Sequence, residues 1–284
     1  MPVRVVESKQ NARLKELRKA LNAPGRGAQA LAGGAGGLAG IEGPNLIEEA
    51  LRAGLRVKTI FVAHEAERLV DALNLPAETE ILHLPKKLLE AALATETPQP
   101  VAALIEPPKW SWSHVLNKNQ EKTLVVVLAG IQDPGNLGTI LRSAEAFGAT
   151  GVVSLPGTVS AWNAKAVRAS AGSVFRVPML GVSEADCFAR LREADVKIWT
   201  TTSRGAKNAD RVELAGPVAL VIGNEGNGVP KDLAAKADGA ITIPCPGPVE
   251  SLNAAVAASV LLYEASRQRS AANVGASKNQ GARR

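Results

Sequence analysis

The polar side chains best placed for chemistry follow directly after apolar strands. A strand predicted over 124–131 ends in QDPGN, which turns the chain and places Asn136 at the start of a helix. Apolar residues at helical spacing form one stripe along that helix, and at about 100° per residue Arg142 falls on the opposite flank. Arg142 is therefore not a core residue and faces solvent, a cleft or a partner. Open parallel sheets bind ligands beyond the carboxyl ends of their strands, and Asn136 lies at such an end.

Two further loops carry polar groups in a comparable position. The sequence GNEGNG surrounds Glu225 with glycines that let the backbone turn tightly and approach a ligand, although a purely structural turn accounts for it equally well. Further along, a turn with three prolines follows Ile243, and Ser251 and Asn253 stand where an apolar helix begins, with Ser251 expected to cap it. Neither the GK[ST] ending nor the GxGxxG fingerprint is present, which argues against a nucleotide-dependent α/β enzyme.

The helix expected from Leu252 to Tyr263 carries almost no charge on any face. Such a helix is buried on more than one side, and its alanines let another helix approach closely. We expect one face to lie on the protein's own sheet and the other on a second copy of the chain. Complete burial within a monomer is the alternative.

The elements that must position these residues form two α/β units. The chain has 284 residues, of which 46% are hydrophobic, enough for two domains with a sizeable core. From residue 124 onward, buried strands alternate with helices, which is typical of a parallel sheet covered on both faces. The expected organisation is a small α/β domain over 1–105, a linker over 106–122, a second domain over 123–270 and a disordered basic tail over 271–284. The glycine-rich segment from Gly25 to Gly43 is expected to be flexible or tightly turned.

Charge favours a polyanionic partner. The net charge is +6, and residues 1–26 contain seven Lys or Arg against two acids. In the linker, Trp110 and Trp112 either stack on bases or, as we favour, fix the linker to a domain.

Several classes of protein are disfavoured. No secretory signal and no apolar run of about 20 residues is found, so a cytoplasmic protein without membrane contact is expected. Cys187 and Cys245 lie far apart in apolar contexts and are predicted to be buried thiols. Three scattered histidines, His64, His83 and His114, argue against a zinc site.

Taken together, three segments resemble the three motifs of the SpoU (TrmH-like) RNA 2′-O-ribose methyltransferases of the SPOUT superfamily. They are DPGNLGTILRSAEAFGA, VIGNEGNGVP and IPCPGPVESLNAAVA. The resemblance runs from about Leu124 to Arg269 and includes KAVRASAGSVFRVP. It implies an α/β fold with a C-terminal trefoil-knotted parallel-sheet domain, preceded by a small α/β RNA-binding domain. It also implies a homodimer, with the first-motif and last helices at the interface.

The resemblance further implies methyl transfer from S-adenosyl-L-methionine to a ribose 2′-hydroxyl, without a metal. Arg142 is the implied catalytic arginine, and because a guanidinium stays protonated we expect it to stabilise the developing alkoxide and grip a phosphate rather than act as a base. Asn136 and Asn253 would orient Arg142, the ribose and the cofactor; Glu225 would hold its loop and orient Arg142, and Ser251 would position the nucleotide or only cap its helix. The implied cofactor-binding residues are Thr200, Thr201, Thr202, Ile222, Gly223, Asn224, Gly226, Ile243 and Leu252.

Relatives with this two-domain layout mostly modify large-subunit ribosomal RNA, so 23S ribosomal RNA is the expected substrate. The alternatives are a tRNA 2′-O-methyltransferase and a non-catalytic RNA-binding protein on the same scaffold. Asn224 stands where a small residue is commoner and Ala255 where serine is. Neither departure removes a matched polar position, so an active enzyme is expected.

Overall fold

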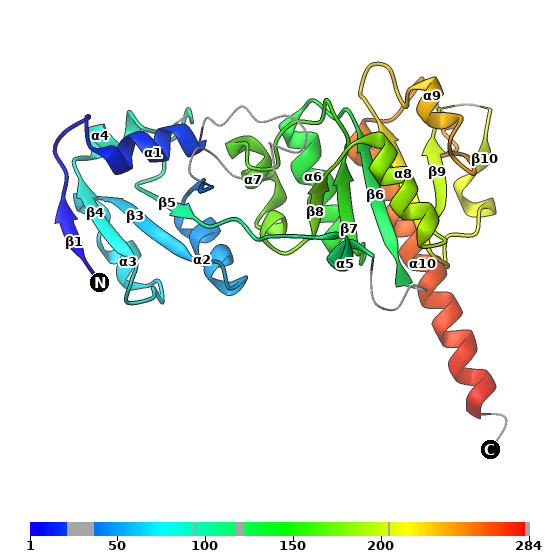
Figure 1. The fold of residues 1–284 in the computed structure, drawn as a ribbon, viewed down its shortest axis with the longest axis horizontal. Coiled ribbons are helices and arrows are strands. Elements are labelled where there is room, and N and C mark those ends of the chain that lie inside the picture. The colour runs from blue at the N-terminus through cyan, green and yellow to red at the C-terminus, as the bar shows by residue number, and fades with distance from the viewer. Residues whose placement is uncertain (22–36, 94, 117–121, 204, 282–284) are drawn as a thin grey trace.

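The computed structural model describes residues 1–21, 37–93, 95–116, 122–203 and 205–281, with side chains described as far as residue 272. These residues form an N-terminal domain and a C-terminal domain, each built on its own sheet, with a long helix at the C-terminal end of the chain (Figure 1). Within this described part, no helix is long and apolar enough to cross a membrane.

The N-terminal domain is a mixed five-stranded sheet with helices on both faces (Figure 1). The strand order is β1-β4-β3-β5-β2, in which β5 pairs antiparallel with β2 and β3, and the other pairs are parallel. The elements are β1 (Val3–Val5), α1 (Ala12–Leu21), β2 (Ala39–Glu42), α2 (Pro44–Arg52), β3 (Val57–Ala63), the 3-10 turn η2 (His64–Ala66), α3 (Arg68–Asp71), β4 (Glu80–Leu84), α4 (Lys86–Glu90) and β5 (Val101–Ile105).

Part of the glycine-rich segment is regular structure. Residues 22–36 lie outside the described part of the chain, but Ala39–Glu42 is the buried strand β2, not a loop. A side chain at Gly40 would place its Cβ 2.8 Å from Cγ of Leu21, so α1 crosses β2 closely because Gly40 lacks one. The small residues, interpreted from the sequence as a sign of a flexible or tightly turned segment, here allow a helix to pack closely on a strand.

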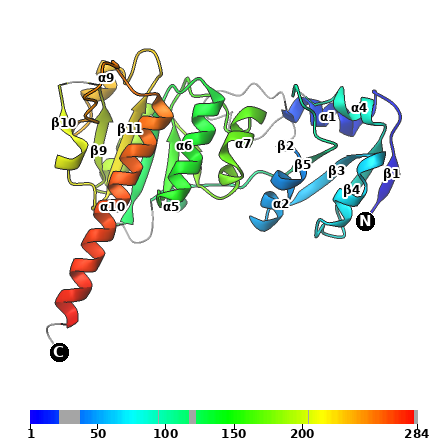
Figure 2. The same cartoon turned by 180° about the vertical axis from the view of Figure 1, so that it is seen from behind.

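The C-terminal domain is a seven-stranded parallel sheet, as predicted, in the order β10-β12-β9-β11-β6-β7-β8. Alternate residues of β6 enter two separate cores: Val126 belongs to the cluster that contains residues of α6 and α10, and Val127 to the cluster that contains residues of α8. Helices α6 and α10 cover one face of the sheet (Figure 2), and α8 covers the other (Figure 1). The trefoil knot implied by the resemblance stays a prediction.

The elements of this domain are β6 (Leu124–Ala129), α6 (Pro134–Ala146), β7 (Gly151–Ser154), α7 (Ala164–Ser170), the 3-10 turn η4 (Ser173–Phe175), β8 (Met179–Gly181), α8 (Glu184–Glu193), β9 (Lys197–Thr201), β10 (Lys207–Asn208), the 3-10 turn η5 (Ala209–Arg211), β11 (Val218–Gly223), α9 (Lys231–Ala234), β12 (Gly239–Thr242) and α10 (Ala254–Gly281).

Helix α10 is longer than expected. It continues through Gly281, whereas a disordered tail was predicted from residue 271. Extending an existing helix fixes one residue per hydrogen bond and avoids the cost of nucleation, so a sequence without apolar periodicity can still prolong it. Arg269 anchors the helix, because its guanidinium donates to the carbonyl oxygens of Lys122, Thr123, Leu214 and Gly216. Burial lowers the pKa of Arg269 below its ordinary value.

The connection between the domains is attached to the C-terminal domain. It contains α5 (Trp112–Val115), whose Val115 is fully buried in the core on the α8 side. Trp112 donates from Nε1 to Oδ2 of Asp186 on α8, at 3.1 Å. Trp112 therefore fixes the connection to a domain, which is the interpretation favoured from the sequence.

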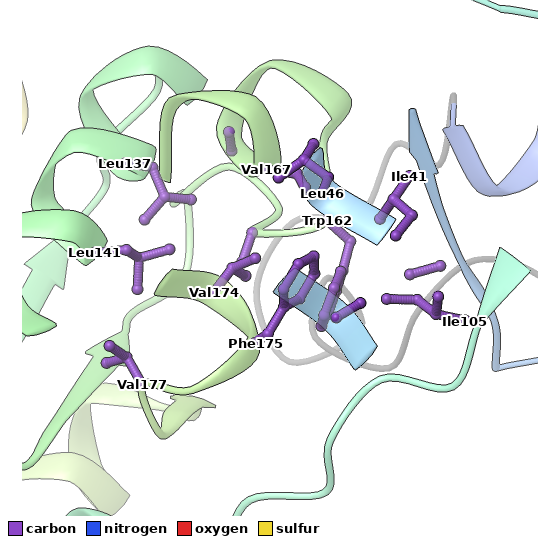
Figure 3. Packing of buried hydrophobic residues seen from close by; sticks show 14 of the residues in the cluster. Ile41, Leu46, Ile105, Leu137, Leu141, Trp162, Val167, Val174, Phe175 and Val177 are labelled. Atoms are coloured by element: carbon purple, nitrogen blue, oxygen red, sulfur yellow. The ribbon is translucent and has the colours of Figure 1, made fainter. Parts of the chain in front are cut away.

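The two domains share one continuous apolar core. Ile41 and Ile105 of the N-terminal domain belong to the same buried cluster as Trp162 and Phe175 of the C-terminal domain (Figure 3). Trp162 is 4% exposed and Phe175 1% exposed, and their rings stack with centroids 6.1 Å apart. Removing the N-terminal domain would expose this aromatic pair to solvent. The C-terminal domain alone is therefore expected to aggregate.

The two cysteines differ. Cys187 is buried, as predicted, and burial raises the pKa of its thiol to about 12. The prediction for Cys245 is wrong, because this thiol is exposed. Cys245 lies in the proline-rich turn after β12, where the prolines hold the chain away from regular structure and from the core.

Candidate functional site

A cavity of about 980 Å³ opens at the carboxyl ends of β9, β11 and β12. Its lining includes apolar side chains from the strand ends and from α10, such as Ile243 and Leu261, beside glycine-rich backbone. All of the residues predicted to bind the cofactor line this one cavity, as do Glu225 and Ser251. The lining residues from the prediction are Thr200, Thr201, Thr202, Ile222, Gly223, Asn224, Gly226, Ile243 and Leu252.

The loop after β11 folds back on itself over the cavity. Asn224 and Gly228 exchange both backbone hydrogen bonds, at 3.0 and 2.9 Å. A Cβ on Gly223 would lie 2.2 Å from the carbonyl carbon of Gly228, so no larger residue fits there. Gly228 has φ +65°, a conformation that glycine adopts without strain.

Asn224 has a structural role that the sequence did not indicate. Its Oδ1 accepts hydrogen bonds from the backbone N–H groups of Gly226 and Asn227, which closes the turn. Its Nδ2 donates to the carbonyl oxygen of Gly130 at 2.8 Å, which ties this loop to the end of β6. The residue that departs from the family pattern therefore pins two loops together.

A chain of side-chain hydrogen bonds joins the three motifs. Asn253 donates from Nδ2 to Oδ1 of Asn136 at 3.0 Å, and Asn136 donates from Nδ2 to Oε1 of Glu225 at 2.9 Å. Glu225 also accepts from the backbone N–H groups of Gln132 and Asp133, at 3.3 Å each. Burial alone would raise the pKa of Glu225, but these hydrogen bonds hold it below its ordinary value. The carboxylate is thus the charged end of a bridge between loops far apart in sequence.

Two helix caps differ from the predictions. Asp133, not Asn136, caps α6, since its Oδ1 accepts from the backbone N–H of Asn136 at 2.9 Å. Asn253, not Ser251, caps α10, because its Oδ1 accepts from the N–H groups of Ala255 and Val256. Ser251 is exposed, and α10 begins at Ala254, later than predicted. Asx and Ser side chains cap equally well, so the sequence alone could not choose between neighbouring candidates.

Arg142 lies away from this bridge. It is exposed on α6, off the core stripe as predicted, and has no hydrogen bond or ion pair with the described residues of its own chain. The expected contact with Glu225 is not present, since that carboxylate binds Asn136 instead. Helix α6 packs beside α10, with Oγ of Ser143 and Oγ of Ser259 2.6 Å apart (Figure 2). The structure brings Asn136, Glu225 and Asn253 together but leaves Arg142 outside that group.

The face of α10 beside α6 is partly uncovered. Ala254, Ala255 and Ala258 are buried against the protein's own core, which confirms the expectation for that face. Val256, Val260 and Tyr263, spaced along the helix at i, i+4 and i+7, are 48%, 38% and 56% exposed. An apolar stripe on an ordered helix thus remains open to a partner.

Both domains match known families. Residues 123–263 match the SpoU rRNA Methylase family, and residues 41–111 match the family described as RNA 2'-O ribose methyltransferase substrate binding.

Individual relatives cover most of the chain. The 23S rRNA (guanosine(2553)-2'-O)-methyltransferase RlmP of Bacillus subtilis (strain 168) is 35% identical over 78% of this chain and 86% of its own length. The crystal structure of an AdoMet-bound rRNA methyltransferase from Sinorhizobium meliloti is 29% identical, with a TM-score of 0.76 over 93% of this chain and 98% of that one. The SpoU methyltransferase AviRb from Streptomyces viridochromogenes, in complex with the cofactor AdoMet, is 28% identical with a TM-score of 0.76, over 92% of this chain and 98% of that one. The chain belongs to the SpoU rRNA methylase family of RNA 2′-O-ribose methyltransferases.

Proposed function

We propose that this protein transfers the methyl group of S-adenosylmethionine to a ribose 2′-hydroxyl of 23S ribosomal RNA. The observation that carries the proposal is the cavity, since motif residues from separate loops line it together and the bridge of Asn136, Glu225 and Asn253 fastens those loops. Two solved relatives are described as holding AdoMet, and the relative RlmP is named for a guanosine of 23S rRNA.

The cavity suits a molecule with an adenine ring and polar ends. Ile243 and Leu252 offer apolar walls, and the backbone around Gly223 offers hydrogen-bonding groups close to the surface, because glycine has no side chain to cover them. Thr201 and Thr202 add hydroxyl groups at the end of β9. S-adenosylmethionine, when bound, would supply a methyl group already activated by its sulfonium. The chain would bind and orient the reactants and stabilise charge. The proton of the 2′-hydroxyl would pass to solvent water, because a guanidinium that stays protonated cannot accept it.

Arg142 is proposed as the catalytic residue that acts on the RNA. A guanidinium keeps its proton, so it stabilises negative charge developing on the 2′-oxygen and donates two parallel hydrogen bonds to a flanking phosphate. The exposed position of Arg142 on α6 leaves its donors available for a phosphate. The hydrogen bonds of Asn136 and Asn253 hold the loops together, and the Glu225 carboxylate fixes them by accepting hydrogen bonds from both Asn136 and the backbone.

The protein is proposed to act as a homodimer. A second copy would cover the stripe of Val256, Val260 and Tyr263 on α10, which otherwise faces water. Because α6 packs beside α10, the same association would bring the partner close to α6.

The choice of substrate is tested by mapping 2′-O-methyl groups in RNA from cells with and without the gene. We expect one nucleotide of 23S rRNA to lose its methyl group, and purified protein with labelled S-adenosylmethionine to restore it. Loss of a methyl group from a tRNA instead would reassign the substrate. RNA binding without any methyl transfer to rRNA or tRNA would favour the non-catalytic alternative.

A further inference from the structure

A group of metal-ligating side chains lies in the N-terminal domain, on a different sheet from the cavity. His64, Glu67 and His83 each offer a ligand atom, and all of these atoms lie within 4.8 Å of one another. We propose that these three residues bind one divalent transition-metal ion, of the kind represented by Zn²⁺.

The fold assembles this group from separate parts of the chain. Strands β3 and β4 run parallel, with Val62 opposite His83, so their carboxyl ends meet at one edge of the sheet. His64 follows the last residue of β3 directly, and Glu67 lies between η2 and α3. Nineteen positions separate the two histidines in sequence, which is why their spacing gave no sign of a site.

The distances suit a common ligand. Oε1 of Glu67 lies 2.9 Å from Nδ1 of His83, and the His64 and His83 rings are nearly parallel, 17° apart, with centroids 6.2 Å from each other. In a tetrahedral zinc site with bonds of about 2.0–2.1 Å, neighbouring ligand atoms lie about 3.4 Å apart. The His83 side chain is only 16% exposed and is fixed in the sheet, whereas His64 and Glu67 are exposed and free to adjust around an ion.

An ion pair between His83 and Glu67 is the simpler explanation, and it leaves two observations unexplained. Nδ1 of His83 is buried and makes no properly directed hydrogen bond with the described residues, even though the carboxylate is near. The pair also gives no reason for the His64 ring to lie alongside. An ion shared by all three residues accounts for both.

The ligand set indicates the class of metal. Two imidazoles and one carboxylate suit zinc and its neighbours, with a fourth position left for water, whereas Mg²⁺ and Ca²⁺ prefer oxygen ligands. The site ties together the end of β3, the turn before α3 and the end of β4. Its role is therefore to stabilise the N-terminal domain, and it takes no part in methyl transfer.

The test is a calorimetric titration of the full chain, first treated with a chelator, with Zn²⁺. We expect one specific site and a higher Tm with zinc, because an ion that binds only the folded state stabilises it. His64→Ala and Glu67→Gln should each weaken zinc binding by tenfold or more, and because both residues are exposed these variants should fold normally without metal. The matched controls are Glu65→Gln, on the same turn and exposed, and His114→Ala in the connection between the domains; both should bind zinc as the unaltered chain does.

The exposed Cys245 is a competing ligand, so Co²⁺ serves as a second probe. The proposed site contains only nitrogen and oxygen ligands, and its cobalt spectrum should lack a thiolate charge-transfer band. Absence of zinc binding at micromolar concentration would overturn the proposal. So would unchanged affinity in both His64→Ala and Glu67→Gln, or a spectrum dominated by thiolate.

Discussion

Arg176 of the C-terminal domain donates from Nη1 to Oε2 of Glu49 in the N-terminal domain, at 2.6 Å. The same guanidinium donates from Nε and Nη2 to Glu145 on α6. Hydrogen bonding to Arg176 holds the pKa of both carboxyl groups below the ordinary range. This bridge lies beside the shared apolar core. Together, the bridge and the core hold the two domains in a fixed relative orientation.

Arg176→Ala should weaken that arrangement. It leaves Glu49 and Glu145 without their common cation, and because all three side chains are partly exposed we expect a loss of about 1–2 kcal/mol in the free energy of unfolding. Denaturant unfolding measures the loss, and small-angle scattering reports the domain orientation. The control Arg190→Ala, which removes a more exposed arginine on α8, should change stability by less than about 0.5 kcal/mol.

RNA binding by the N-terminal domain should depend on lysines of α1. Arg4 and Arg13 are engaged by Glu80, so part of the basic excess read from the sequence is already neutralised. Lys15 and Lys19 are exposed and remain available for phosphates. Changing both to Gln should lower RNA affinity and reduce the slope of log K against log salt by about 1.5, since each phosphate contact contributes about 0.7–0.9.

The control for this experiment is Lys197→Gln, at the start of β9 in the other domain, with S-adenosylmethionine affinity expected to be unchanged in every variant. Substitution is preferred to truncation because a chain without the N-terminal domain would expose Trp162 and Phe175. Equal RNA affinity and salt slope in the double variant and the unaltered chain would place the RNA surface elsewhere.

The Glu225 bridge should make cofactor binding sensitive to acid. Because the folded-state pKa of Glu225 lies below the ordinary 4.5, its carboxylate stabilises the loops fully above that value, and the stabilisation is lost as pH falls through the folded-state pKa. Affinity for S-adenosylmethionine should therefore decline below pH 4.5. Glu225→Gln should bind about tenfold more weakly at neutral pH, the equivalent of one hydrogen bond to a charged group.

Asp133 also lies near these loops, and hydrogen bonding, first of all to Lys165, lowers its pKa below the ordinary value, so its protonation adds to the effect of acid. The informative quantity is thus the difference between Glu225→Gln and the unaltered chain, which should shrink as pH falls through the folded-state pKa of Glu225. A constant difference across that range would show that the charge of Glu225 does not hold the loops.

Sequence patterns predicted the helices and strands better than the side-chain contacts between them. The parallel sheet and the exposed flank of α6 follow from local periodicity. The family resemblance implied the cofactor-binding residues, and these line the cavity at the second and third motifs and at the end of β9, whereas no residue of the first motif lines it. The shared core of Ile41 and Trp162 did not follow, since nothing local marks which apolar residues meet across domains. The caps at Asp133 and Asn253 were missed for a related reason: several residues at each helix start can make the same hydrogen bond.

The dimer is best tested at Val260. Ala258, on the same helix, is fully buried within the chain, so a charge there would unfold the protomer and say nothing about a partner. Val260 is 38% exposed, and Val260→Glu should leave the protomer folded while shifting a dimer to monomers in sedimentation. Ala189→Glu, on the exposed face of α8 across the sheet, is the matched control. A monomeric unaltered chain at micromolar concentration would contradict the proposed association.

The proposed role of Arg142 leads to the most discriminating prediction. Arg142 is exposed and off the core stripe, so Arg142→Ala should change the free energy of unfolding by no more than about 0.5 kcal/mol. Affinity for S-adenosylmethionine should persist, because Arg142 does not line the cavity. The rate of methyl transfer should fall by about 10²–10³, the usual contribution of a group aimed at developing charge.

Arg142→Lys separates charge from geometry. Lysine keeps the positive charge but lacks the planar fork that donates two parallel hydrogen bonds, so it should restore little of the rate if Arg142 grips a phosphate or alkoxide at two points. Single-turnover rates with saturating cofactor measure this directly, because they exclude product release. Recovery of most of the rate in Arg142→Lys would show that a point charge suffices. Turnover near that of the unaltered chain in Arg142→Ala would assign the charge stabilisation to another residue.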